Sequence, residues 1–111
     1  MHKLVILFQP QEDWQAFENS WPQFLHYVEA MPGLKREASS HVDGFLYGPY
    51  RVAQMHELFF DSLNDAGEAI ASPAGQEAGR LLQTMTKGKF ILFIAEHKED
   101  DLERIQQYKS S

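Results

Sequence analysis

The sequence predicts an α+β fold in which a four-stranded antiparallel sheet carries helices on one face. Three observations support this prediction. Short apolar runs lie near both ends of the chain, in the stretches 3–8 and 89–97, where the apolar residues are 4–8 and 90–95. A third run, 52–61, is rich in β-forming residues and leads directly into a helix-capping serine, Ser62. Between these strands, apolar residues recur every three or four positions, which is the spacing of a helix that faces a core.

The first strand, 3–8, precedes a helix whose core-facing residues are Trp14, Phe17, Trp21, Phe24, Leu25 and Val28. Pro22 interrupts this helix, and Ser20 with Gln23 forms a Ser-x-x-Gln capping pattern. Because proline is tolerated best in the first turn of a helix, the pattern predicts a break or kink near Ser20. Met-Pro-Gly-Leu at 31–34 ends the second helical segment.

The middle of the chain predicts a hairpin with a long loop. The stretch 35–42 fits a strand with a polar outer face, and Asp43-Gly44 is a turn signal. An aromatic loop punctuated by glycine and proline follows at 45–50 and leads into the third strand at 52–61.

Two helical pieces follow the third strand. Ser62 caps the first, at 63–71, and Ser72 with Pro73 starts the second, which extends to about Met85.

The last strand, 89–97, completes the order β-α-β-β-α-β, which is the ferredoxin-like arrangement. The acidic and then mixed tail, 99–111, has apolar residues at helical spacing and predicts a short, weakly docked helix. We therefore expect one domain at 1–98, followed by this tail.

The composition bounds the class of protein. A chain of 111 residues with 43% hydrophobic residues is long enough for one globular core. The net charge of −6 argues against a nucleic-acid surface, which requires clustered lysine and arginine. No apolar run approaches the roughly 20 residues that span a bilayer, and the first run is too short for a signal peptide. The absence of cysteine excludes disulfides and thiolate catalysis. We expect a cytoplasmic protein that binds neither nucleic acid nor membrane.

The first and last strands are apolar on both faces, although the helices of this fold cover only one face. Leaving six large apolar side chains in water would forgo roughly 1.5–3 kcal/mol each, which is comparable with the whole stability of a domain. A second copy of the same sheet is the simplest cover. The sequence therefore predicts a homodimer whose sheet faces pack together into an α+β barrel.

Five motifs carry a resemblance to a known family: KLVILF at 3–8, MPGL at 31–34, HELFFDS at 56–62, SPAGQEAG at 72–79 and FILFIAE at 90–96. With the element order, they make the chain similar to the EthD family of the dimeric α+β barrel superfamily. The resemblance implies a homodimer and a loose association with oxidoreductase chemistry. Similar barrels act as cofactor-free quinone-forming monooxygenases, lactone isomerases and polyketide cyclases, and they hold a small organic substrate between sheet and helices. The resemblance thus implies an organic ligand and no cofactor.

One motif of the family is altered. EthD-like chains usually carry Trp/Tyr-x-x-x-His in the first helix, about eight residues before Pro-Gly-Leu. Here His26 follows Trp21 by five residues, and counting back from Pro32 gives Phe24. Either a kink at Pro22 absorbs a shift of one residue or the family's histidine is missing.

The third strand carries the main candidate residues on alternating faces. One face holds Val52, Gln54, His56, Leu58 and Phe60, and the other holds Ala53, Met55, Glu57 and Phe59. If Met55 and Phe59 pack under the helices, His56 looks into the barrel. There it could act as a general base or orient a phenolate, because its ordinary pKa is about 6.5. The alternative is a structural histidine that hydrogen bonds to a neighbouring strand or across the dimer.

Two further residues are candidate acid–base groups. Glu57 either acts in catalysis or pairs with Arg51, Arg80 or a lysine. His26, at the edge of the apolar stripe, either pairs with His56 or is an ordinary surface histidine.

Aromatic and polar residues near the third strand are candidate substrate contacts. Tyr47, Tyr50 and Arg51 flank a Gly-Pro turn and suit the entrance of a site for an anionic or phenolic ligand. The alternative is a loop that packs at the dimer edge. Gln54 and Phe60 share the His56 face and complete the candidate binding residues.

Metal and haem sites receive little support. His41, Asp43 and His56 could be imagined as a metal triad, but no His-x-x-His or Glu-x-x-His pattern occurs, so we predict no metal. A haem would need His26, His41, His56 or His97 as its axial ligand.

The leading interpretation is a cofactor-independent enzyme of oxidoreductase (monooxygenase), cyclase or isomerase type. It would act on a small aromatic or polyketide-like molecule in an apolar cavity, with His56 as acid–base group and His26 as a candidate second. The alternative is a non-catalytic homodimer that binds a hydrophobic ligand or partner.

Overall fold

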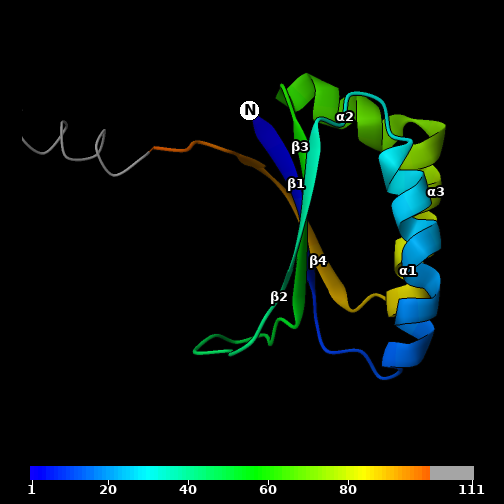
Figure 1. Cartoon of the computed structure of the whole chain (residues 1–111), viewed down its shortest axis with the longest axis vertical. Helices are drawn as coiled ribbons and strands as arrows, with labels where there is room; N and C mark the ends of the chain where they lie inside the picture. The colour runs from blue at the N-terminus through cyan, green and yellow to red at the C-terminus, as the bar shows by residue number, and fades with distance from the viewer. Residues whose placement is uncertain (101–111) are drawn as a thin grey trace, which may run out of the picture.

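In the computed structural model, which describes residues 1–100, the chain forms four strands and three helices (Figure 1). In chain order they are β1 (His2–Phe8), α1 (Trp14–Glu29), β2 (Arg36–His41), β3 (Gln54–Phe60), α2 (Leu63–Ala71), α3 (Pro73–Thr86) and β4 (Phe90–Glu96). The predicted order is confirmed. Of the tail in which a helix was predicted, residues 101–111 lie outside the described residues.

The four strands form one sheet in the order β2-β3-β1-β4, and every neighbouring pair is antiparallel. In this register His56 on β3 lies opposite Ile6 on β1 and Ser39 on β2. All three helices cover the same face of the sheet (Figure 1). This is the ferredoxin-like arrangement that the sequence predicts.

Helix α1 is continuous through Pro22, so the break predicted near Ser20 is wrong. The helix begins instead at Asp13, whose carboxylate accepts a hydrogen bond of 3.0 Å from the backbone N–H of Ala16. The residues that α1 buries lie on both sides of the proline: Phe17, Phe24 and Val28. Because both halves bury one stripe, packing outweighs the hydrogen bond that proline removes.

The caps predicted for the other two helices are confirmed. The Ser62 hydroxyl accepts from the backbone N–H of Asp65, and the Ser72 hydroxyl accepts from Gly75 N–H while it donates to the Ala69 carbonyl. None of the helices in residues 1–100 is long and apolar enough to cross a membrane.

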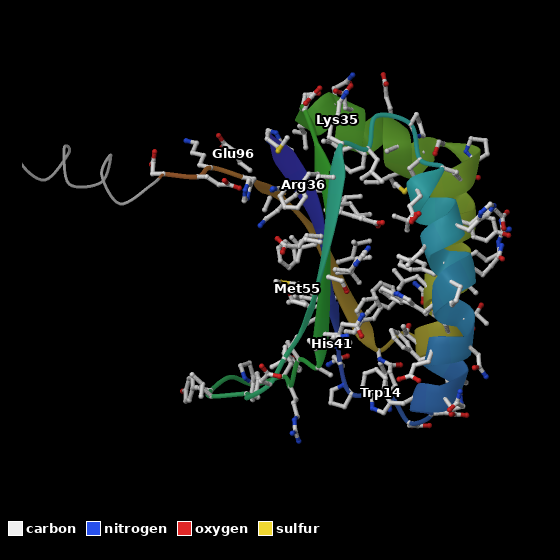
Figure 2. All side chains as sticks on the ribbon, viewed as in Figure 1. Trp14, Lys35, Arg36, His41, Met55 and Glu96 are labelled. Carbon is white, nitrogen blue, oxygen red and sulfur yellow. The ribbon has the colours of Figure 1, made fainter. Side chains whose placement is uncertain are left out.

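The two faces of β3 are opposite to the arrangement considered above. The ring of His56 contacts Trp21 of α1, so His56 and its alternate neighbours face the helices. Met55 and Glu57 consequently face away from them, and Figure 2 shows Met55 on the side of the sheet opposite α1. The idea that Met55 and Phe59 pack under the helices is therefore wrong. Both faces are rich in apolar residues, so alternation alone could not orient the strand.

The face of the sheet away from the helices, which we call the open face, combines apolar residues with an ion pair. The Lys3 ammonium lies 2.5 Å from the Glu57 carboxylate, and both side chains are less than one-fifth exposed. Around them, Phe93 is 42% exposed and Ile91 is 37% exposed. Large apolar side chains thus remain uncovered within residues 1–100, as expected from the composition of the strands.

Candidate functional site

A cavity of about 490 Å³ lies between α1 and the ends of β2 and β3, and we call it the main cavity. Its walls are Trp14, Phe17, Glu18, Trp21 and Pro22 on the helix and Ser39, His41, Val42, Ala53 and Gln54 on the sheet. Figure 2 labels Trp14 and His41 at this end of the molecule, on the helix layer and on the sheet. The lining combines six apolar residues with four polar ones, and the volume lies within the roughly 300–1,000 Å³ that is typical of small-molecule sites.

Gln54 supplies a polar group to this cavity. Its side chain lines the cavity, although the residue is only 5% exposed. The amide makes no side-chain hydrogen bond within residues 1–100. Since a buried amide is normally hydrogen bonded, Gln54 is available to bind a polar group of a ligand.

His56 lies beside Gln54 on the same face of β3 and is almost completely buried, with 2% of its surface exposed. Its Nε2 lies 3.1 Å from a carboxylate oxygen of Glu37 on β2. Its Nδ1 is buried and has no hydrogen-bond partner in residues 1–100. The rings of Trp21 and Phe24 pack against the imidazole at centroid distances of 5.2 and 6.4 Å.

Burial lowers the pKa of His56, and this effect outweighs the carboxylates of Glu29 and Glu57, which favour the charged form. The imidazole is therefore neutral near pH 7. An ionised carboxylate only accepts hydrogen bonds, so Nε2–H donates to Glu37 and Nδ1 keeps the free lone pair. This carboxylate–imidazole pair can accept a proton at Nδ1.

Two predicted site residues lie elsewhere. Glu57 is on the open face and pairs with Lys3, which is the lysine alternative considered from the sequence. Phe60 is completely buried in the hydrophobic core and does not line the main cavity. Neither side chain therefore lines the main cavity.

The aromatic loop and the helical histidine are also apart from His56. Tyr47 is 96% exposed and Tyr50 is 63% exposed. Arg51 lines an adjoining hollow of about 310 Å³ that shares Trp14, Val42 and Ala53 with the main cavity. His26 is exposed on α1, where its ring contacts Tyr27. The pairing of His26 with His56 that the sequence suggested is not present.

Glu37 was missed by sequence reasoning. It lies in a short polar strand, and its contact with His56 depends on the register of β2 against β3. A long loop joins these two strands, so no tight turn fixes their register in the sequence.

No group of three or more histidine, aspartate or glutamate side chains among the described residues could hold a metal ion. His41, Asp43 and His56 therefore do not form such a group.

Comparison with known proteins places these features in a known fold. No family model matches the chain. An uncharacterised 11.0 kDa protein of Rhodococcus erythropolis, from the thcB-thcC intergenic region, is 25% identical over 99 residues, which are 88% of this chain and 96% of the relative.

Several solved structures are similar to this chain in fold. An ethyl tert-butyl ether d (EthD) family protein from Bacillus halodurans matches with a TM-score of 0.80 and 24% identity, over 88% of this chain and 99% of that one. A dimeric ferredoxin-like protein of unknown function from Jannaschia matches at 0.67 and 13%, covering 86% and 98%. SnoaB, a cofactor-independent oxygenase from Streptomyces nogalater, matches at 0.64 and 12%, covering 91% and 95%. The chain therefore has the EthD-like, ferredoxin-like fold that its motifs predicted.

Proposed function

We propose that this EthD-like chain is a cytoplasmic, homodimeric, cofactor-independent enzyme that removes a proton from a small aromatic or polyketide-like molecule. In this proposal residues 1–98 form one domain. The observation that carries it is the Glu37–His56 pair, whose Nδ1 has no partner in residues 1–100, beside a cavity of about 490 Å³. The cofactor-independent oxygenase SnoaB shares the fold, which supports chemistry of this class.

The proton would move from an acidic O–H of the substrate, or from a C–H next to its carbonyl, to Nδ1 of His56. The electron pair stays on the substrate as a phenolate or enolate. Glu37 stabilises the imidazolium that forms, and the free amide of Gln54 donates to the substrate oxyanion. Trp21 lines the cavity and packs on His56, so in this proposal its ring moves aside to admit the substrate to the imidazole.

The open face supports the homodimer. It carries exposed apolar residues of β4, and both the β2–β3 loop and residues 97–100 extend to that side of the sheet (Figure 1). Several proteins of this fold are described as dimeric. A second sheet on this face would complete the α+β barrel.

The experiment is a screen of phenols and polycyclic hydroquinones that follows substrate absorbance and oxygen uptake. An active compound is then tested with His56→Gln, Glu37→Gln and His26→Gln. We expect His56→Gln to lower kcat/KM by about 10²–10⁴-fold, which is the usual contribution of a general base. Glu37→Gln should have a smaller effect, because the base remains, and His26→Gln should have none.

Full activity in His56→Gln would refute the proposal. If the wild-type protein binds the screened compounds but converts none of them, the alternative is favoured, namely a non-catalytic dimer that binds a hydrophobic ligand. One observation supports that alternative: Nδ1 of His56 is sealed from solvent.

A further inference from the structure

A second, smaller cavity lies on the other side of His56. It has a volume of about 90 Å³, is located between α1, α3 and the sheet, and is lined only by apolar residues and glycine. We call it the apolar slot. Its walls include Ile6, Phe24, Leu58, Ala78, Gly79 and Leu92.

His56 lines neither cavity, but it lies between residues that line them: Gln54 lines the main cavity and Leu58 lines the slot on the same face of β3. On the slot side its neighbours are Ile6, which is opposite it in the sheet, and Phe24, which packs on its ring. On the main-cavity side its neighbours are Ser39, opposite it on β2, and Trp21. The rings of Trp21 and Phe24 are 5.5 Å apart, so three side chains form the partition between the two spaces.

Gly79 is an exposed residue of α3 that lines the slot, and it is a glycine without a backbone reason. Its φ is not positive, and a Cβ at this position would meet no atom within 4 Å. A glycine inside a helix costs about 1 kcal/mol relative to alanine, so the backbone of α3 would be more stable with a side chain here. Gly75, one turn earlier, differs because its Cβ would lie 2.1 Å from the Ala69 carbonyl oxygen.

We propose that the substrate has two parts: a polar aromatic head in the main cavity, against Gln54 and His56, and a short alkyl substituent in the apolar slot. The head is the ligand of the proposed function, on which this inference rests. A dry cavity of about 150 Å³ holds benzene, so a slot of about 90 Å³ fits a chain of about three or four carbons better than a second ring. Rotation of the Trp21 or Phe24 ring connects the two spaces.

The test is isothermal titration of the whole chain with 4-alkylphenols, from phenol to 4-hexylphenol. Each methylene should tighten binding about fourfold, which is about 0.8 kcal/mol, until the chain reaches three or four carbons. Gly79→Leu adds a large side chain at a residue that lines the slot, so the gain in affinity should stop at shorter chains. Ala78→Val is an independent variant that narrows the slot from its buried wall. Gly67→Leu is the matched control, because Gly67 is an exposed glycine of α2 that also has open space around its Cβ.

The increase in affinity with alkyl chain length decides this inference. If the wild-type protein shows no gain, or if Gly79→Leu and Ala78→Val keep the full gain, the slot does not hold the substituent. The binding of phenol, which has no alkyl chain, tests the head site of the proposed function separately. Gln54→Leu should weaken phenol binding, and equal binding would count against the head site but not against the slot.

Discussion

Acidification below neutrality should destabilise the folded protein through His56. Burial lowers the pKa of this imidazole in the folded state, whereas in the unfolded chain its pKa is about 6.5. Below pH 6.5 the unfolded chain therefore binds a proton that the folded chain does not bind. The free energy of unfolding then falls as the pH falls, until the folded pKa is reached.

The size of this effect follows from the burial. The side chain of His56 is 3% exposed, so solvent screening is small. If the folded imidazole stays neutral throughout, the free energy of unfolding falls by about 1.4 kcal/mol between pH 7.5 and pH 5.5. This is an upper limit, because the neighbouring carboxylates favour the charged form. It is still a large fraction of a domain stability of about 5–15 kcal/mol.

The assay is urea unfolding at pH 7.5, 6.5 and 5.5, comparing the wild-type protein with His56→Gln at one protein concentration. Glutamine does not titrate, and its amide can still donate to Glu37. The other four histidines, His2, His26, His41 and His97, are present in both proteins, so their contributions cancel in the difference. The wild-type protein should lose up to about 1.4 kcal/mol more than the variant. Equal losses would show that His56 is not held neutral.

Two further predictions concern assembly and helix α3. Phe93→Glu places an unpaired charge on the open face and should weaken the dimer at least about tenfold, measured by size-exclusion chromatography with light scattering. Leu63→Glu, at an exposed position of α2, is the control and should remain dimeric. Gly75→Ala should lower the free energy of unfolding by roughly 1–3 kcal/mol because its Cβ overlaps a carbonyl oxygen, whereas Gly79→Ala should raise it by up to about 1 kcal/mol. Equal urea midpoints for the two alanine variants would contradict the close approach of α2 and α3.

The elements that the sequence predicts well are those with a local cause. The strand β1 is apolar from Leu4 to Phe8 and ends before Pro10. Helices α2 and α3 follow Ser62 and Ser72, whose hydroxyls do cap them. Chain order then restricts the sheet to few topologies. These signals need no knowledge of distant contacts, which explains why the architecture follows from them.

The prediction fails where a distant contact outweighs a local signal. The capping pattern at Ser20 and Pro22 is a local signal for a new helix, yet α1 continues because Phe17 and Phe24 bury one stripe on both sides of it. The orientation of β3 fails for a related reason. Its two faces are similar in hydrophobicity, and only the position of α1 decides which one is covered.

The candidate site was predicted in part. His56 and Gln54 lie on one face because strand alternation is a local property, and the structure confirms that they share it. Glu37 was not predicted, because its contact with His56 needs the register of two strands joined by an irregular loop. His26 was a candidate because it lies at the edge of the apolar stripe, and its exposed position on α1 reflects the helix face that Phe24 and Val28 bury.

Strand β3 joins the proposed chemistry to the proposed assembly. His56 faces the helices and contacts Glu37, while the next residue, Glu57, faces the open side and pairs with Lys3. A register shift of one residue would exchange the two side chains, placing a carboxylate under the helices and the imidazole on the dimer face. The ion pair of Glu57 with Lys3 opposes such a shift, since Glu57 under the helices would be a buried charge separated from its partner. We infer that Glu57 serves the site by maintaining this register, so Glu57 and Lys3 act on His56 through the sheet and not through contact with a substrate.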